Sequence, residues 1–287
     1  MIQNKLLGLI RLVRPLNSLM TGFAVLVGEF LAYRALYFYP SILGFITAFT
    51  ITGASMVIND YWDRFLDEIN APSRPIPSGL VSVKLALFYA LLLILIGISS
   101  ALFTNSHSFL IAIFSLSISL IYSYRGKKLG LIGNFMVGFC IAIPLFYGGT
   151  VYDGVNFGFQ GMKSLIIFDF MVFLAITARE INKGIADIEG DKVKGINTIA
   201  VIYGSKVAAV LASVFYLAAV TLSLIPWFLS LTSFMYLPLV TIADVGFIIS
   251  SFILLRVNTK KNAIKVKRIV LIWMFLGLFA FISGGIS

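Results

Sequence analysis

The sequence has little charge for its length. Only 12% of its 287 residues are charged, whereas 60% are hydrophobic, and the mean hydropathy is +1.00. A water-soluble domain needs more polar side chains than this to cover its surface. The shortage of charge therefore excludes a soluble globular protein. It also excludes a soluble domain that binds nucleic acid, so no nucleic-acid partner is expected.

The chain also contains only one cysteine, Cys140, and one histidine, His107. A single cysteine cannot form an intramolecular disulfide, and Cys140 lies between apolar neighbours, which is typical of a small buried side chain. His107 lies at the end of an apolar segment, away from the acidic loops. No histidine is therefore available there to accept a proton or to bind a metal.

What the sequence has instead is a series of apolar runs that are each long enough to cross a membrane as a helix. About 20 apolar residues cross the roughly 30 Å of hydrocarbon in a bilayer. The apolar segments between charged or turn-rich stretches predict nine spans. The shortest breaks between two predicted spans are "ALYFYP" and "LFTNSHS". The predicted spans are 17–36, 41–58, 82–102, 107–124, 131–151, 163–181, 206–227, 231–255 and 266–285. We therefore expect an all-α, polytopic membrane bundle.

The basic residues are distributed unequally between the two sides of these spans. All of the 22 lysines and arginines except Arg34 and Lys163 lie before the first span or in alternate loops on one side. Because cytoplasmic loops carry the excess of lysine and arginine, this places the N-terminus inside and the C-terminus outside. The net charge of +10 then lies on one membrane face, where it attracts anionic lipid headgroups and a phosphorylated substrate.

Most of the acids fall into two clusters on that same face. In the first, Asp60, Asp63 and Asp67 have the spacing i, i+3, i+7 and share one helical face if the second span continues as a helix, with Asn59 beside them. In the second cluster, Asp187 and Asp191 have the spacing i, i+4 after the sixth span. Carboxylates held this close repel one another unless a cation lies among them.

Hard oxygen ligands without histidine or cysteine favour Mg²⁺ over zinc or copper. Two such clusters facing a common cavity, with lysine and arginine around them, predict a site for a diphosphate bridged by Mg²⁺. The plainer alternative is that these acids are a solvated loop with helix caps and surface ion pairs to Arg64 or Lys192. The joint spacing of both clusters on one face favours the metal site.

The two motifs resemble the signatures of a known family. "NDYWDRFLDEINAPSRPIPSG", residues 59–79, and "AREINKGIADIEGDKVKGINTIAVIYG", residues 178–204, are similar to the two aspartate-rich motifs of the UbiA superfamily of intramembrane prenyltransferases. The loop "YSYRGKKLGLIGN" is similar to the family's basic loop between spans four and five, and Asn17 falls where the family carries an asparagine.

The resemblance implies a single domain over residues 1–287, with nine helices around a central cavity open to the cytoplasmic face. Two similar four-helix halves, about 17–124 and 131–255, would be followed by a ninth helix. It also implies that Mg²⁺ on the two motifs binds an isoprenyl diphosphate. The implied catalytic and metal-binding residues are Asn59, Asp60, Asp63, Asp67, Asp187 and Asp191. The implied diphosphate-binding residues are Asn17, Asn59, Arg74, Lys127, Lys128 and Lys183.

Gly184 after Lys183 distinguishes this chain from many relatives that prenylate aromatic quinone precursors, which have an aspartate at this position. The phrase "REINKGIADIEGD" resembles more closely the archaeal branch that transfers a geranylgeranyl group from its diphosphate to geranylgeranylglyceryl phosphate, a step of ether-lipid synthesis. The phosphate of such a lipid-like acceptor would need a cation, for which Arg125, Lys127 and Lys128 are candidates. An aromatic acceptor is the alternative within the family.

A secondary transporter is the alternative of another class, because two similar halves with acids near helix ends also describe transporters. Transporters place their binding groups near the middle of the bilayer, whereas these acids lie at one face. In an enzyme of this kind, breaking an allylic carbon–oxygen bond requires stabilisation of the diphosphate leaving group, which metal, lysine and arginine supply. The sequence does not choose between an aspartate and the released diphosphate as the group that takes the acceptor's proton.

Overall fold

A computed structural model describes residues 2–156, 160–193 and 195–285, and helices make up nearly all of these segments. Nine of the helices in the described segments are long and apolar enough to cross a membrane. The helices are α1 (Ile2–Leu12), α2 (Pro15–Tyr33), α3 (Phe38–Asn70), α4 (Val83–Thr104), α5 (Ser106–Tyr124), η1 (Gly126–Lys128), α6 (Leu131–Gly148), α7 (Gln160–Val193), α8 (Ile199–Ser223), α9 (Ile225–Phe228), α10 (Tyr236–Arg256) and α11 (Lys260–Gly285).

The predicted all-α membrane bundle of nine spans is confirmed, including its two shortest divisions. The break at "ALYFYP" lies between α2 and α3, and the break at "LFTNSHS" lies at Asn105, which separates α4 from α5. The Asn105 side chain accepts a hydrogen bond of 2.9 Å from the backbone N–H of Ser108, which caps α5. One capping residue is therefore enough to turn the chain between two apolar helices.

Several predicted ends were wrong. The second and sixth spans were predicted to end at 58 and 181, but α3 and α7 continue to Asn70 and Val193. Both Asp motifs are therefore helical. Helix α8 begins at Ile199 rather than 206, where the Thr198 side chain accepts from the Val201 N–H at 3.3 Å. Its backbone breaks at Gly204, which has a φ of 85°, so the part of the helix after the break begins close to the predicted start of the seventh span. Helix α1 was not predicted, because its four basic or amide residues interrupt the apolar run.

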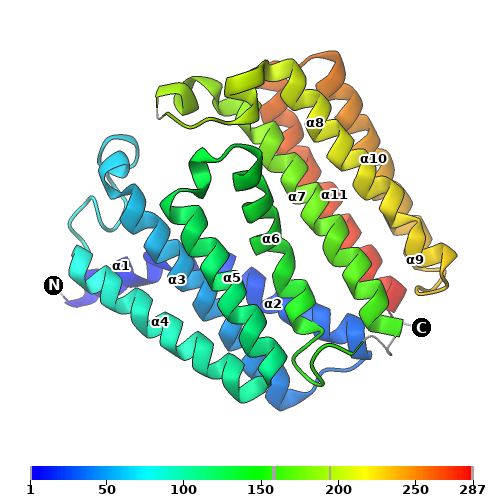
Figure 1. Ribbon diagram of the computed structural model, residues 1–287, viewed down its shortest axis with the longest axis horizontal. Helices are drawn as coiled ribbons and strands as arrows, with labels where there is room; N and C mark the ends of the chain where they lie inside the picture. The colour runs from blue at the N-terminus through cyan, green and yellow to red at the C-terminus, as the bar shows by residue number, and fades with distance from the viewer. Residues whose placement is uncertain (1, 157–159, 194, 286–287) are drawn as a thin grey trace.

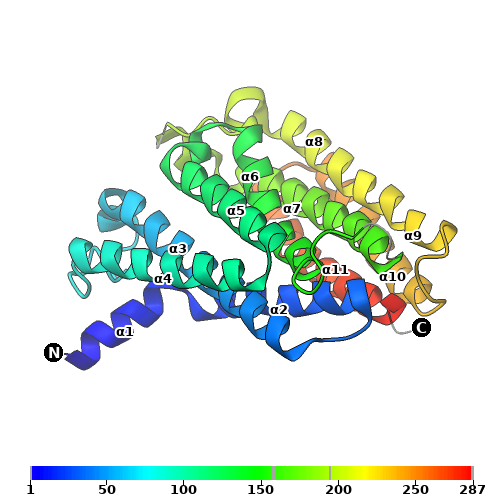
Figure 2. The same cartoon turned by 60° about the horizontal axis from the view of Figure 1, so that its bottom comes forward.

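The helices lie in two groups that meet at α6 and α7 (Figure 1). Helices α3, α4 and α5 pack together on one side, and α8, α10 and α11 pack on the other. Helix α2 packs against α3, α6 and α7, and so closes the bundle where its first and last helices approach each other. Helix α1 lies at the edge of the bundle, where it contacts α3 and where Leu12 packs with Ala54 and Val57, and it runs at an angle to α2 (Figure 2). The central cavity and the two similar halves stay predictions.

Glycine allows α2 and α6 to pack at close range. A Cβ at Gly28 would overlap the Leu145 carbonyl oxygen, and a Cβ at Gly148 would overlap the Val25 carbonyl oxygen. Small residues that let backbones approach are the usual means of helix association within lipid, where apolar burial gives little driving force. The reciprocal pair of glycines therefore holds the first helix of the bundle against α6.

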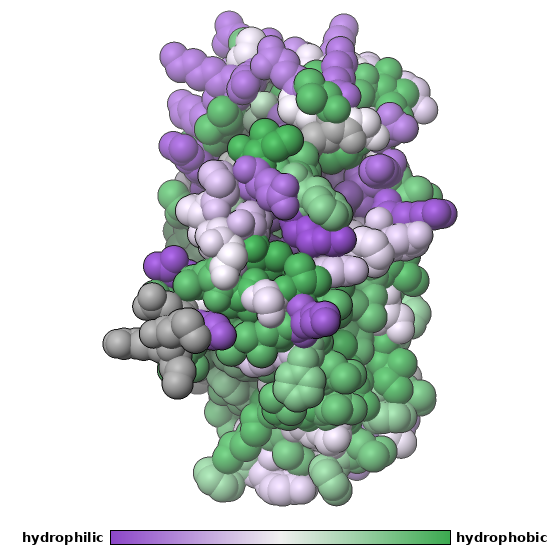
Figure 3. All heavy atoms as spheres, turned by 90° about the vertical axis from the view of Figure 1, so that its left-hand side faces the viewer, coloured by the Kyte–Doolittle hydropathy of each residue, from purple (hydrophilic) through white to green (hydrophobic). Residues whose placement is uncertain are grey.

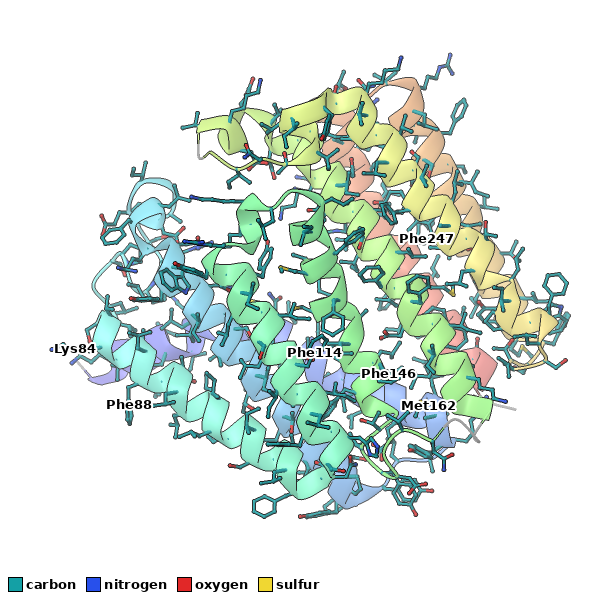
Figure 4. The ribbon with its side chains drawn as sticks, in the orientation of Figure 1. Lys84, Phe88, Phe114, Phe146, Met162 and Phe247 are labelled. Carbon is teal, nitrogen blue, oxygen red and sulfur yellow. The ribbon has the colours of Figure 1, made fainter. Side chains whose placement is uncertain are left out.

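The outer surface of the bundle is apolar, as a membrane requires. Phe88 on α4 points away from the bundle and is 65% exposed, whereas Phe247 on α10 faces inward and stacks on Tyr216 of α8 (Figure 4). Long apolar helices with large apolar side chains on their outer surface suit a lipid environment rather than water. The protein is therefore a multi-pass membrane protein.

Candidate active site

The two Asp motifs lie at the same end of the bundle. The C-terminal ends of α3 and α7 both point toward the top of Figure 1, and α11 begins at this same end. Figure 3 shows that hydrophilic side chains gather at this end, while the opposite part of the same face is mostly apolar. Residues that are more than a hundred positions apart in the sequence are thus brought to one polar end of an otherwise apolar molecule.

The first motif forms a network of ion pairs around two nearly buried carboxylates. Asp60 and Asp67 are 4% and 6% exposed. Arg74, which follows α3 in the loop, donates to Asp67 Oδ2 at 2.5 Å and to Asp60 Oδ1 at 3.5 Å. One guanidinium therefore joins two aspartates that are two helical turns apart, which confirms that they share a face. Buried carboxylates need such partners, because an unpaired charge is costly to remove from water.

Arg74 remains charged in this setting. Burial lowers the pKa of its guanidinium, but the hydrogen bond with Asp67 and the charges of Asp60, Asp67 and Asp63 together raise the pKa above its ordinary value. The end of α3 therefore holds a permanent cation among its carboxylates. This guanidinium supplies the counter-charge that the spacing of the aspartates calls for.

Asp63 is held by residues of two different segments. Lys127 of η1 donates to Asp63 Oδ2 at 2.5 Å. In the side-chain orientation that suits both neighbours, the Asn59 amide nitrogen donates to Asp63 Oδ2 at 3.0 Å and the amide oxygen accepts from Lys127 Nζ at 3.0 Å. The basic loop between α5 and α6 is thus tied to the first motif. Arg64, by contrast, stacks over the rings of Tyr61 and Phe65 and forms no ion pair with a described acid.

Sequence reasoning missed the part played by Arg14. Arg14 lies between α1 and α2 and donates to Asp60 Oδ1 at 2.7 Å, closer than Arg74 does. Its backbone has a φ of 46°, in the left-handed region that residues other than glycine seldom adopt. In the sequence, Arg14 contributed only to the distribution of basic residues that predicts membrane orientation. The only local signal for a turn here was Pro15, because proline often begins a helix.

The second motif lines a pocket rather than an ion-pair network. Asp187 and Asp191 of α7 share a pocket of about 510 Å³ with residues of α11. Its lining residues are Ala186, Asp187, Glu189, Gly190, Asp191, Lys260, Ile264, Lys267 and Arg268. The two aspartates therefore share one face of α7, as their spacing predicted. The facing cations of α11 were not among the predicted site residues.

The remaining predicted residues lie outside these networks. Lys183 pairs with Glu180 at 3.0 Å, and Glu180 also accepts from Arg179 at 3.0 Å. Lys128 and Asn17 are exposed, and neither side chain forms a hydrogen bond with another described residue. Asn17 lies in the first turn of α2, where its N–H donates to the Arg14 carbonyl at 2.9 Å.

Tyr122 of α5 is within electrostatic reach of Asp63 of α3 and of Glu180 and Asp191 of α7. Within the described parts of the chain, no three carboxylate, histidine or cysteine side chains converge as one compact cluster of ligands. The carboxylates of the first motif are instead held apart by Arg14, Arg74 and Lys127.

Two acids inside the spans, Glu29 and Asp244, are held by hydrogen bonds within the fold. Glu29 is fully buried and accepts from the Tyr37 N–H at 2.9 Å and the Ser41 hydroxyl at 2.6 Å, which holds the start of α3. Asp244 accepts from the Ser223 hydroxyl at 2.7 Å. Each acid thus has a hydrogen-bond donor within the chain, so neither needs a ligand to be satisfied.

Comparison with known proteins agrees with this arrangement. Residues 21–280 match the UbiA prenyltransferase family. Two relatives with the name digeranylgeranylglyceryl phosphate synthase are similar over nearly their whole length. The one from Methanosphaera stadtmanae is 34% identical, with 96% of this chain and 98% of that protein covered. The one from Methanosarcina mazei is 36% identical, with 96% and 97% covered.

Solved structures show the same fold. A structure described as digeranylgeranylglyceryl phosphate synthase in membranes has a TM-score of 0.88 at 31% identity, covering 98% of this chain and 99% of that one. A UbiA homologue from Archaeoglobus fulgidus, bound to GPP and Mg²⁺, has a TM-score of 0.68 at 18% identity, covering 96% and 99%. The prediction of a prenyltransferase rather than a transporter is confirmed, and the chain belongs to the UbiA prenyltransferase family.

Proposed function

We propose that this protein transfers a geranylgeranyl group from geranylgeranyl diphosphate to geranylgeranylglyceryl phosphate, forming digeranylgeranylglyceryl phosphate. The observation that carries the proposal is the similarity over 96% of the chain to relatives with the name of that synthase. The chemistry of the polar end supports it, because two acidic motifs and several cations lie where a diphosphate and a second anionic substrate would meet.

The donor set of the two motifs suits Mg²⁺. Its members are carboxylate and amide oxygens, with no histidine or cysteine among them, and Mg²⁺ prefers such ligands. Asn59, Asp60, Asp63 and Asp67 would hold one ion, and Asp187 and Asp191 another. The structure of the Archaeoglobus fulgidus homologue with GPP and Mg²⁺ supports a metal-dependent reaction. A metal ion held by these residues would supply positive charge for the leaving diphosphate.

The cations around the first motif would bind the diphosphate. Arg74 and Lys127 already lie against the carboxylates, at 2.5 Å from Asp67 and Asp63, so a phosphate entering there exchanges one anionic partner for another. Asn17, Lys128 and Lys183 would add contacts at the rim. This arrangement stabilises the leaving group as the allylic carbon–oxygen bond breaks, which is the main catalytic requirement.

The reaction then forms one ether bond. The diphosphate leaves with the electron pair of the allylic carbon–oxygen bond, the acceptor hydroxyl oxygen bonds to the allylic carbon, and the hydroxyl proton passes to an aspartate of the site or to the released diphosphate. The apolar interior of the bundle would exclude water that could otherwise capture the allylic carbocation. We further propose that the polar end faces the cytoplasm, with the N-terminus inside and the C-terminus outside, because the basic loops lie on that side.

The test is a transfer assay with the purified protein in detergent and Mg²⁺. Radiolabelled geranylgeranyl diphosphate is offered with geranylgeranylglyceryl phosphate, or with 4-hydroxybenzoate, in parallel. We expect label to move to the glyceryl phosphate, to stop with EDTA and to return with excess Mg²⁺. Asp63→Asn should lower the rate on the order of 100-fold, the usual cost of losing one preorganised group that stabilises the transition state.

Glu68→Gln is the matched control, because Glu68 lies beside Asp67 on α3 in the first acidic cluster but is exposed. It should retain most of the activity. Transfer of label to 4-hydroxybenzoate instead would move the protein to the aromatic branch while keeping its diphosphate chemistry. Full activity in EDTA would refute the metal assignment.

A further inference from the structure

Four of the residues that line the pocket beside the second motif come from α11. Lys260, Ile264, Lys267 and Arg268 are spaced i, i+4, i+7 and i+8, so they form one face of the helix, and that face meets Asp187 and Asp191 of α7. We call this the α7/α11 pocket. Lys265 lies on the same basic stretch but points elsewhere and is exposed. Only three of the basic residues at the start of α11 therefore line the pocket.

Three of the charged residues that line this pocket, Asp187, Lys267 and Arg268, are unpaired among the described residues. Lys260 lies 3.5 Å from Glu189, but both side chains are largely exposed, at 64% and 89%, so the pair is weak. Lys267, Arg268 and Asp187 form no hydrogen bond or ion pair through their side chains with any other residue that the structure describes. Two cations and a carboxylate thus share one pocket without neutralising one another.

This differs from the first motif, where each aspartate already has a cationic partner. Asp60 pairs with Arg14, Asp63 with Lys127 and Asp67 with Arg74. Opposite charges left unpaired around a pocket of about 510 Å³ are the arrangement expected when a ligand supplies the missing partners. An anion would bind Lys267 and Arg268, and the Asp187 carboxylate would remain available for a metal ion.

We infer that the α7/α11 pocket binds the phosphate of the acceptor, with Lys267 and Arg268 as its ligands. This inference rests on the proposed function, in which the acceptor carries a phosphate monoester. Arg268 offers a planar fork of donors and Lys267 a compact charge, the two side chains most used to recognise phosphate. The pocket adjoins Asp187 and Asp191, so a phosphate held there places the acceptor beside the second motif. The phosphate site lies on the last helix, away from the basic loop between α5 and α6.

The experiment compares Lys267→Gln, Arg268→Gln and Lys265→Gln in the same transfer assay. Lys265→Gln is the matched control, because it removes the same charge from the same helix outside the pocket. At saturating donor, Lys267→Gln and Arg268→Gln should each raise the KM for geranylgeranylglyceryl phosphate about tenfold or more, because each removes a hydrogen bond between charged groups. The KM for geranylgeranyl diphosphate should change less than about twofold. This is much smaller than the tenfold change expected for the acceptor, which corresponds to about 1.4 kcal/mol.

A second acceptor isolates the phosphate. With dephosphorylated geranylgeranylglycerol, wild type and both pocket variants should react at the same rate, so the preference for the phosphorylated acceptor falls in the variants only. An equal rise in the KM for the donor would assign the pocket to the diphosphate and overturn the inference. An unchanged acceptor KM in both variants, with wild type active, would overturn this inference alone, whereas a wild type without transfer to this acceptor would overturn the proposed function as well.

Discussion

Lys127 Nζ lies 2.5 Å from Asp63 Oδ2, although 64 residues separate the two in the sequence. The contact joins η1 to α3 and brings the basic loop against the first acidic motif. Lys128, the next residue, is exposed, and its side chain forms no hydrogen bond or ion pair with the described residues. The structure therefore distinguishes two lysines that have the same charge and adjacent positions.

Lys127→Ala should impair the reaction much more than Lys128→Ala. Loss of Lys127 removes a cation beside Asp63 and leaves a partly buried carboxylate without its ion pair, so we expect kcat/KM to fall on the order of 100-fold. Lys128→Ala should lower it less than about fivefold, as expected of an exposed charge. Steady-state kinetics in detergent measures both, and equal losses would show that Lys127 has no special part.

Arg14→Gly separates the backbone of this turn from its side chain. Glycine adopts the positive φ of residue 14 without strain, so the fold should persist, but Asp60 keeps only Arg74 at 3.5 Å. We expect activity to fall about tenfold or more, the effect of losing one charge-assisted hydrogen bond. Arg11→Ala, at an exposed position of α1, is the control.

The thermal unfolding midpoint of Arg14→Gly should remain within a few degrees of wild type in the same detergent. Full activity with unchanged unfolding would mean that the 2.7 Å pair with Asp60 does not contribute to the site. Low activity accompanied by a large fall in the midpoint would mean that Arg14 acts through stability instead.

Local patterns in the sequence predicted the spans and the faces of both Asp motifs. The length of an apolar run is almost sufficient by itself to predict a transmembrane helix. A spacing of three, four or seven residues places side chains on the same face of a helix. Asp60 and Asp67 meet the same guanidinium for that reason. The continuation of α3 through its charged end was predictable from the same spacing, although the end of the helix was not.

Contacts between distant segments were not predictable in this way. Arg14 approaches Asp60 only because the chain turns between α1 and α2, and Lys267 faces Asp187 only because α11 packs on α7. Neither arrangement leaves a periodic signal in the sequence. Helix α1 was missed because its polar residues interrupt the apolar run, and run length was the property used to find helices.

Gly28→Ala should destabilise the fold, whereas Gly184→Ala should not. A Cβ at Gly28 meets the backbone oxygen of Leu145, which cannot move aside without separating α2 from α6, and overpacking of this kind costs about 1–3 kcal/mol. At Gly184 a Cβ would lie 3.6 Å from Thr198, an ordinary contact, and alanine favours a helix by about 1 kcal/mol over glycine. Thermal unfolding in detergent compares the two variants. A lower midpoint for Gly184→Ala than for Gly28→Ala would contradict the close approach of α2 and α6.

The proposed orientation can be tested with single cysteines, because Cys140 is the only native one. In a Cys140→Ser background, Ser78→Cys places a thiol in the loop after α3, and Asp153→Cys places one between α6 and α7, where both native residues are exposed. These loops lie at opposite ends of the spans, because successive spans run in opposite directions. A membrane-impermeant thiol reagent applied to intact cells should label Asp153→Cys at once and Ser78→Cys only after the membrane is opened.

The distribution of lysine and arginine is the physical reason for this expectation, because translocating a basic loop is unfavourable. Ser78 belongs to a loop that contains Arg74, and the same end of the bundle holds the basic start of α11. Labelling of Ser78→Cys in intact cells, with Asp153→Cys protected, would place both Asp motifs on the outer face. The phosphorylated substrates would then have to approach from outside the cell, which would contradict the role proposed for the polar end.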